Sequence, residues 1–250
     1  MTVTAGGRTE TGPRSLNQDW LDWDLGLGLF VVADGMGGHN AGEVAAHLAV
    51  QAIHEFVRAS ADEGEVSWPF PADPGLSADA NRLLTAVRLA NRRVYDEGLA
   101  HAAFDGMGTT VVGVLVTGRR ASIVSVGDSR VYRWRDGTLV QLTSDDTWLS
   151  VVMGMPDDDR AQSTHPMRNV LTSVVGTRAD VQPTVRDEAL EPGDRLVLCS
   201  DGIHGRLDPA QMAAVLGRGG DAETLAGALV HEALACGTTD NATALVVAFD

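Results

Sequence analysis

The feature that most constrains the fold of this chain is a set of aspartates at the ends of short apolar segments. They are Asp34 after residues 29–33, Asp128 after residues 123–127, Asp201 after residues 196–200, and Asp240 before residues 243–249. Short, continuous apolar runs are typical of buried strands. A carboxylate beside a buried strand loses hydration, which is unfavourable unless it meets a cation or stays in solvent. The fold must therefore expose these strand ends or gather them around positive charge.

Two interpretations of these aspartates differ in what lies beside the carboxylates. In the first they are solvated turn residues, which suits Asp105 and Asp136 because glycine follows each of them. In the second, several carboxylates share bound divalent cations, which remove their mutual repulsion. No lysine occurs in the sequence to balance them. Oxygen ligands alone favour Mg²⁺ or Mn²⁺. Both interpretations remain open at this point.

The net charge of the chain limits the classes of partner that it is expected to bind. Its 250 residues include 34 acidic and 19 basic side chains, which gives a net charge of −15. Such a charge repels nucleic-acid backbones and anionic membrane surfaces, so we expect neither as a partner. The two cysteines predict no disulfide framework and no zinc site. Residues 1–18 lack the apolar core of a signal peptide, and no apolar run is long enough for a membrane helix, so we predict a cytoplasmic protein.

Hydrophobic periodicity predicts an α+β fold. Apolar residues recur at helical spacing over 41–59 and 77–99, and Ser77 is a suitable N-cap. Short segments rich in β-branched and aromatic residues follow, and turns at Gly118 and Asp136 predict an antiparallel meander. The predicted elements from there on are strands 110–117, 121–126, 130–134, 138–142, 169–175, 181–186 and 195–200, helices 209–216 and 222–235, and strand 243–249. Strands and helices are grouped rather than alternating, which favours antiparallel sheets.

Seven short motifs occur together, in an order that is far more specific than any one of them. They are RSLNQD (14–19), VADGMGGH (32–39), GTT (108–110), VGDSRVY (126–132), HPMRNVLT (165–172), CSDG (199–202) and DNAT (240–243). Together they resemble the PPM family, the metal-dependent serine/threonine protein phosphatases of type 2C, and above all its short bacterial members. The resemblance extends from about residue 6 to residue 249.

The resemblance implies a four-layer sandwich, in which two antiparallel β-sheets pack face to face and a pair of antiparallel helices covers each outer face. It implies a single phosphatase domain over residues 1–250, with a flap over about residues 147–168 beside the active site. The flap is shorter than in many relatives, and Asp146 stands where many of them have histidine. Because such flaps influence substrate choice, the resemblance says least about substrate preference.

The resemblance also implies a centre of two Mn²⁺ or Mg²⁺ ions at one edge of the sandwich. By similarity, Asp34 bridges the ions and the carbonyl oxygen of Gly35 binds one of them. Asp201 and Asp240 bind the other ion, and Asp19 holds metal-bound waters.

Four further residues bear on the third ion, on phosphate binding and on the general acid. Asp128, together with Asp201, matches the site of a third, weaker ion in bacterial members. Arg14 provides a planar guanidinium that can clamp two phosphate oxygens. Many eukaryotic members have histidine after Asp-Gly as the proposed general acid, but here that position is Met36, whose thioether cannot donate a proton. His39 is one candidate for that role, and the alternative is that it is a structural residue or a neighbour of the phosphate.

The expected activity is hydrolysis of phosphoserine and phosphothreonine on proteins, by direct attack of a metal-bridging hydroxide, with Asp34 and Arg14 as catalytic residues. Expected partners are phosphoprotein substrates, including a serine/threonine kinase or its targets, and the chain is expected to be a monomer. One alternative is a catalytically silent relative that binds phosphoproteins, which the intact aspartates and Arg14 argue against. Another is a metal-dependent nuclease or phosphodiesterase, which the net charge of −15 disfavours.

Overall fold

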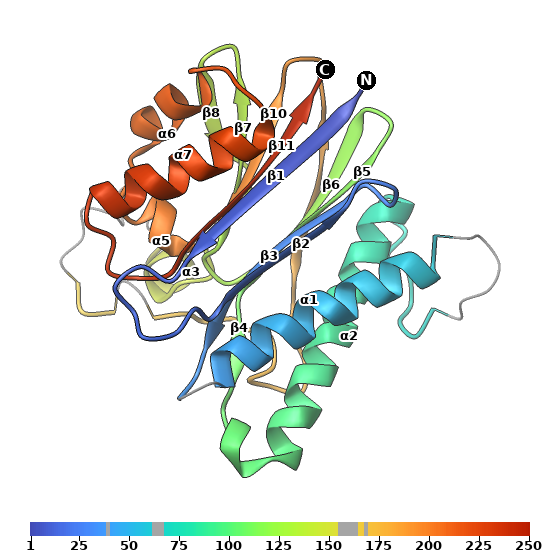
Figure 1. The fold of residues 1–250 in the computed structure, drawn as a ribbon. Helices are drawn as coiled ribbons and strands as arrows, with labels where there is room; N and C mark the ends of the chain where they lie inside the picture. The colour runs from blue at the N-terminus through green and yellow to red at the C-terminus, as the bar shows by residue number, and fades with distance from the viewer. Residues whose placement is uncertain (39–40, 62–67, 155–164, 168–169) are drawn as a thin grey trace.

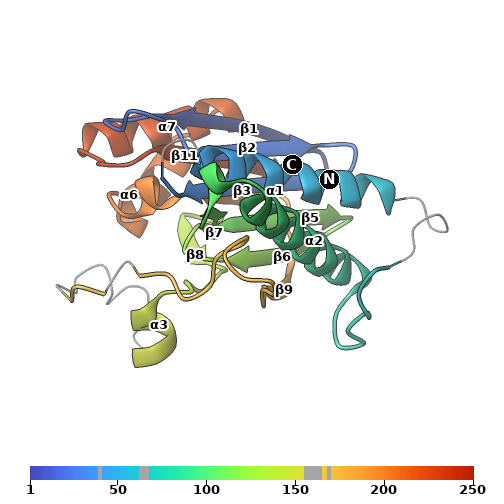
Figure 2. The ribbon, with the colours of Figure 1, turned by 90° about the horizontal axis from the view of Figure 1, so that it is seen from below.

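The computed structural model describes residues 1–38, 41–61, 68–154, 165–167 and 170–250. The chain forms two antiparallel β-sheets packed face to face (Figures 1 and 2). The first sheet has the strand order β1-β11-β10-β7-β8, and the second has the order β2-β3-β5-β6-β9, with short β4 paired to β3. The strands are β1 Val3–Glu10, β2 Asp19–Asp24, β3 Leu29–Met36, β4 Gly108–Thr109, β5 Val111–Thr117, β6 Arg120–Val126, β7 Arg130–Arg135, β8 Thr138–Gln141, β9 Thr184–Ala189, β10 Arg195–Cys199 and β11 Ala242–Phe249.

Helices cover the outer face of each sheet. The second sheet carries α1 (Ala41–Ala59) and α2 (Ala78–Ala100), and the first carries α6 (Pro209–Leu216) and α7 (Ala222–Ala235). The short elements are η1 (Ala102–Phe104), α3 (Trp148–Met153) and α5 (Asp201–His204). Figure 2 shows α3 lying away from both sheets. The predicted α+β sandwich with helices on both outer faces is confirmed.

Apolar side chains fill the three spaces between these layers. Between the sheets lie fully buried residues such as Phe30, Ile123 and Phe249. Separate apolar clusters join α1 and α2 to the second sheet, and α6 and α7 to the first. Because each helix buries its apolar face against a sheet, the strand ends that carry the aspartates stay at one edge of the sandwich, outside these cores.

Local capping explains why the predicted helix boundaries are close to those observed. The Ser77 hydroxyl accepts a hydrogen bond from the Ala80 N–H at 3.2 Å, so α2 begins directly after Ser77. Asp208 and Gln211 cap the start of α6 reciprocally, at 2.8 and 2.9 Å, with Pro209 at the first helical position. Each signal lies within one turn of its helix and can therefore be recognised without the tertiary structure.

Two strand predictions are wrong. The predicted continuous meander is divided, because β5 and β6 pair in the second sheet whereas β7 and β8 pair in the first. The chain crosses between the sheets at Gly127, which has a positive φ of 94°. The predicted strand at 169–175 is not formed. In the described part of that segment, Val175 makes an isolated bridge to Thr109, and Leu171 makes one to Thr147.

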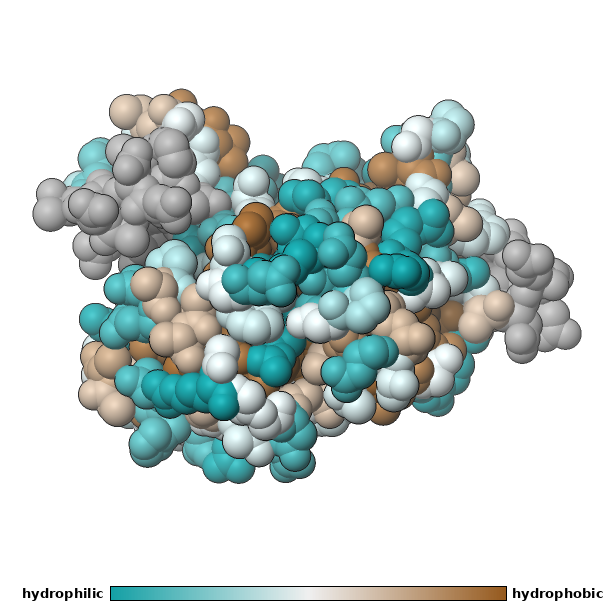
Figure 3. All heavy atoms as spheres, turned by 90° about the horizontal axis from the view of Figure 1, so that it is seen from above, coloured by the Kyte–Doolittle hydropathy of each residue, from teal (hydrophilic) through white to brown (hydrophobic). Residues whose placement is uncertain are grey.

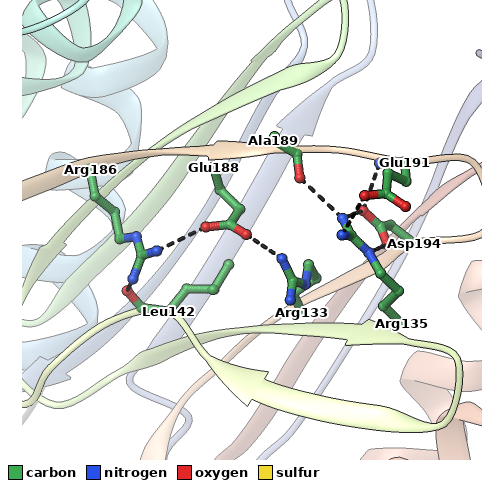
Figure 4. A network of polar contacts seen from close by, with 8 residues as sticks. All are labelled: Arg133, Arg135, Leu142, Arg186, Glu188, Ala189, Glu191 and Asp194. Atoms are coloured by element: carbon green, nitrogen blue, oxygen red, sulfur yellow. Dashed lines mark hydrogen bonds and ion pairs between the residues drawn. The ribbon is translucent and has the colours of Figure 1, made fainter.

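A network of charged side chains joins the two sheets at the end remote from the aspartates (Figure 4). Glu188 of β9 forms ion pairs with Arg133 of β7 and, at 2.8 Å, with Arg186 of β9. Arg135 of β7 binds the two carboxylate oxygens of buried Asp194 at 2.6 and 2.7 Å. Because paired charges tolerate burial, this network balances acidic side chains without a metal ion.

Hydrophilic residues are prominent over the face of the molecule drawn in Figure 3, with apolar residues scattered between them. In the described residues, no helix combines the length and apolar character needed to cross a membrane.

Candidate active site

The predicted site aspartates meet at one edge of the sandwich, where strands of both sheets begin or end. Asp19 opens β2 and pairs with Asp34 near the end of β3. Asp201 lies two residues after the end of β10, and Asp240 lies two residues before β11. Ser200 Oγ donates to Asp19 Oδ2 at 2.8 Å, which ties the end of β10 in the first sheet to β2 in the second. These strand ends lie together at the lower left of Figure 1.

Two glycines allow this close approach. A Cβ on Gly35 would lie 2.0 Å from the Gly42 carbonyl oxygen and 2.7 Å from that of Gln18, so glycine is required where β3 meets the start of α1. A Cβ on Gly202 would lie 1.8 Å from the Asn241 carbonyl oxygen. Because each glycine directly follows a site aspartate, the close packing holds Asp34 and Asp201 at the shared edge.

The clustered carboxyl groups interact strongly. The pKa of Asp34 is raised well above its ordinary value, first because the group is removed from water and then because of the negative charges of Asp19, Asp201, Asp128 and Asp240. Each of these neighbours therefore lies close enough to act on Asp34. The five predicted aspartates form one electrostatic unit, which we call the aspartate cluster.

Two further members of the cluster are shifted in the same direction. Burial raises the pKa of Asp19 to about 6, and the charge of Asp240 adds to this effect, whereas hydrogen bonds from Thr243 and Ser200 oppose it. Burial also raises the pKa of Asp201 to about 7, followed in effect by the charges of Asp128 and Asp240. Strand ends that were merely solvated would show no such shifts, so the turn interpretation of these residues is not supported.

Unsatisfied oxygen atoms show that the cluster suits a cation. Asp19 Oδ1 and Asp201 Oδ1 are buried and have no hydrogen-bond partner among the described residues. A buried oxygen without a donor is unfavourable, and divalent cations with their bound waters would satisfy such oxygens. In the part of the chain that the structure describes, no three acidic, histidine or cysteine side chains already converge as a metal-binding group.

Arg14 lies beside the cluster. Its Nη2 atom forms an ion pair with Asp240 Oδ2 at 2.7 Å, and its Nε donates to the Thr239 carbonyl oxygen at 3.0 Å. The Arg14 side chain is 55% exposed, so much of the guanidinium still faces solvent. It is therefore placed to reach an anion that arrives at Asp240.

The loop that carries Asp128 is fixed by its backbone. The Gly127 N–H donates to Asp146 Oδ2 at 3.0 Å, and the Asp146 N–H donates to the Gly127 carbonyl oxygen at 2.8 Å. His204 Nε2 lies 3.0 Å from the Asp128 carbonyl oxygen. Asp146, which stands where many relatives have histidine, thus attaches the base of the predicted flap to the loop before Asp128.

Several polar residues that support the site were not predicted from the sequence. The side-chain amide of Asn241 donates to the carbonyl oxygens of Thr11 and Leu16 at 2.8 Å, and its oxygen accepts from the Gln18 N–H at 2.9 Å. Asn241 thereby holds the loop that carries Arg14. Thr109 Oγ1 donates to the Asp34 carbonyl oxygen at 2.9 Å. The sequence signal that could have identified Asn241 and Thr109 is a polar residue beside the end of an apolar strand.

Two residues bear on the identity of the general acid, namely Met36, whose thioether cannot donate a proton, and the candidate His39. Met36 closes β3 opposite Gly108 and is 42% exposed. His39 lies outside the described residues, so its role stays a prediction. Of the predicted flap, residues 155–164 and 168 also lie outside the described residues.

Comparison with known proteins identifies clear relatives. The chain matches the family model "Protein phosphatase 2C" over residues 7–235. A putative protein phosphatase 2C-type of Streptococcus pyogenes is 35% identical over 217 residues, which are 84% of this chain and 82% of the relative. The serine/threonine protein phosphatase PstP of Mycobacterium tuberculosis is 36% identical over 88% of this chain, which spans 40% of PstP. A solved structure of the PstP catalytic domain in complex with two manganese ions matches with a TM-score of 0.80 and 30% identity, over 98% of this chain and 97% of that one.

Proposed function

Because the chain belongs to the protein phosphatase 2C family and is a metal-dependent serine/threonine protein phosphatase, we propose that its aspartate cluster is the catalytic metal centre. The observation that carries this proposal is that five aspartates near strand ends of both sheets interact electrostatically, with buried, unpartnered oxygens on Asp19 and Asp201. Aspartates that served only as solvated turn residues would not be expected to cluster, because their negative charges repel one another.

We assign the ligands within the cluster as follows. Asp34 and the Gly35 carbonyl oxygen would hold one ion, and Asp34, Asp201 and Asp240 would hold a second. Asp19 supports the centre from behind, because Ser200 and Thr243 hold its other oxygen. When bound, paired divalent cations supply a water of lowered pKa as nucleophile and neutralise charge on the phosphoryl oxygens.

Arg14 binds the phosphate of the substrate in this proposal. Its planar guanidinium offers several N–H donors to phosphoryl oxygens and is exposed beside Asp240. The ion pair between Arg14 and Asp240 holds the guanidinium at the mouth of the cluster. Met36 carries no proton to give to the leaving group, so another group must supply it.

The substrates and setting of the enzyme remain proposals as well. We assign phosphoserine and phosphothreonine residues of proteins as substrates, including those of a serine/threonine kinase or its targets. The net charge of −15 supports this choice over nucleic acid. We further propose that residues 1–250 act as a single catalytic domain, as a monomer and in the cytoplasm.

A direct test of the function compares substrates and metals. The chain should release phosphate from a phosphothreonine peptide when Mn²⁺ or Mg²⁺ is added, and should lose this activity in EDTA. It should not cleave DNA under the same conditions. Cleavage of DNA would favour the nuclease alternative, and binding of the peptide without hydrolysis would favour the catalytically silent one. Full activity in metal-free buffer would exclude the proposed mechanism.

We propose that Asp128, with Asp201, holds a third and weaker ion. Its charge raises the pKa of Asp34 and of Asp201, which supports a role beside the cluster, and it comes from a different loop. The contacts between Gly127 and Asp146 and between Asp128 and His204 involve backbone atoms of Gly127 and Asp128. A substitution of the Asp128 side chain leaves these backbone hydrogen-bonding atoms in place.

Asp128→Ala should lower turnover of a phosphopeptide by roughly tenfold or more, because an ion that helps to position water is lost while the paired ions stay. Anomalous scattering from crystals of this variant soaked in Mn²⁺ should show two strong metal peaks. Wild-type turnover would mean that Asp128 is only a turn residue. Loss of the paired ions would instead make it a ligand of the main centre.

A further inference from the structure

A pocket of about 450 Å³ lies beside α2, apart from the aspartate cluster. One wall is a polar face of the helix, with Arg88, Asn91, Arg92 and Tyr95. Residues 179–182 form the opposite wall, and Phe70 closes one side. Figure 2 shows the segment before β9 passing close to α2, in agreement with the hydrogen bonds between them. A pocket of this volume is large enough for a ligand the size of a phosphorylated side chain.

Asn91 makes the pocket a built feature of the fold. It is buried, and its side-chain amide donates to the carbonyl oxygens of Arg178 and Ala179 at 3.0 and 3.1 Å. Its own oxygen accepts from the Gly176 N–H at 2.8 Å. These three hydrogen bonds satisfy the Asn91 amide and fix the facing wall against α2. The pocket therefore exists before a ligand arrives, which lowers the entropic cost of binding.

The two arginines of this pocket lack the carboxylate partners that most arginines among the described residues have. Most arginines in the described ranges form an ion pair with a carboxylate, including Arg93, which pairs with Glu55 at 2.8 Å. Within the same ranges, neither Arg88 nor Arg92 forms an ion pair. In a chain with a net charge of −15, two arginines without a carboxylate partner in one pocket point to an external anion.

A contact with Phe70 positions the Arg88 guanidinium in the pocket. The guanidinium lies over the Phe70 ring, 5.7 Å from the ring centroid. A cation–π contact of this kind does not use the N–H groups as hydrogen-bond donors, so they stay available. Arg92 lies one helical turn further along α2, and the hydroxyl of Tyr95 has no hydrogen bond within the described part of the chain. Two guanidinium groups and a hydroxyl provide the donors that a phosphate group requires.

We propose that this pocket binds a phosphate group carried on a protein segment, as a docking site for a second phosphorylated residue of the substrate. The proposal rests on the function assigned above. Asp96 and Asp180 also line the pocket, so a free anion meets repulsion there, whereas a segment with a basic residue beside its phosphorylated residue matches both signs of charge. When one phosphorylated residue of a substrate protein occupies the aspartate cluster, a second phosphorylated residue of that substrate is held near the pocket. Its effective concentration there is then higher than that of a free phosphopeptide.

The wall of the pocket is continuous with the surroundings of the cluster. Val175, just before this wall, pairs with Thr109, and Thr109 donates to the Asp34 carbonyl oxygen. A substrate segment bound at the pocket would thus contact the segment that continues from Val175, and Val175 is linked through Thr109 to Asp34 of the aspartate cluster.

The test uses the whole chain, stripped of metal with EDTA so that no hydrolysis occurs. Calorimetry should show binding of a short phosphothreonine peptide with an adjacent arginine, and weaker binding of its unphosphorylated copy. The double variant Arg88→Gln, Arg92→Gln should raise the Kd for the phosphopeptide about tenfold or more, because charge-assisted hydrogen bonds to phosphate are lost. Arg93→Gln is the matched control, since it removes the same charge from the next residue of α2, outside the pocket. It should change the Kd by less than about twofold.

Three results would overturn the proposal. They are an unchanged Kd in the double variant, an equal loss in Arg93→Gln, and inorganic phosphate binding as tightly as the peptide with the same dependence on Arg88 and Arg92. A thermal melt establishes that each variant is folded. With Mn²⁺ present, the double variant should hydrolyse p-nitrophenyl phosphate like the wild type, but its KM for a doubly phosphorylated peptide should rise. If the wild type fails to hydrolyse p-nitrophenyl phosphate, the proposed function fails, while calorimetry still tests the pocket.

Discussion

Asp34→Asn should lower kcat for p-nitrophenyl phosphate roughly several hundred-fold or more, because a paired-metal site loses its nucleophile when the bridging ligand is removed. The negative charges of all four other aspartates of the cluster raise the pKa of Asp34, so this residue interacts with every other member. We expect Asp240→Asn to have a similarly large effect. Both can be measured by steady-state hydrolysis with saturating Mn²⁺.

Stability measurements separate loss of catalysis from loss of the fold. Ionising Asp34 is unfavourable in the metal-free chain, as the rise in its pKa shows, so Asn at this position should leave the Tm in EDTA unchanged or raised. Added Mn²⁺ should raise the Tm of the wild type and have little effect on Asp34→Asn. Asp136→Asn is a matched control, because Asp136 occupies a turn with φ of 49°, which asparagine tolerates. Wild-type kcat in Asp34→Asn would refute the assignment of the metal centre.

Arg14→Ala should lower kcat/KM by roughly ten- to several hundred-fold, because it removes charge-assisted hydrogen bonds to the phosphate. The affinity for Mn²⁺, measured by calorimetry, should not weaken. Arg14 forms an ion pair with Asp240, so in the absence of substrate it competes with a cation for that carboxylate. Removing Arg14 should therefore leave Mn²⁺ binding equal or slightly tighter.

Arg14→Lys distinguishes charge from geometry. It keeps the positive charge but loses the planar pair of donors, so we expect it to recover part of the activity lost in Arg14→Ala. If Arg14→Ala abolishes Mn²⁺ binding, the role of Arg14 is to shape the loop beside Asp240, and its assignment to the substrate is wrong.

Much of the fold could be predicted because its signals are local. The α1 boundaries follow from apolar spacing, and the start of α2 follows from the capping residue Ser77. The site aspartates were also found from the sequence, since a carboxylate at the end of an apolar run is unusual wherever the strand lies. That they form one catalytic centre came from the resemblance to a family and not from their spacing.

The failures have a common physical cause. The segment at 169–175 has the residues of a strand, yet Val175 makes only an isolated bridge to Thr109, because strand formation depends on which edge is available for pairing. Similarly, β6 and β7 read as neighbours in a meander, but the chain crosses to the other sheet at Gly127. Local propensity does not specify the pairing partner.

The sequence by itself determined which residue types carry the chemistry and where most helices begin and end. Only the tertiary structure decided which of these residues meet. Arg14 and Asp240 are 226 positions apart and form an ion pair at 2.7 Å. Asn91 holds a segment more than 80 residues away, and so creates a pocket that no local pattern indicates. The physical reason is that caps and periodicity act within a few residues, whereas burial, ion pairing and pocket shape arise from packing between distant segments.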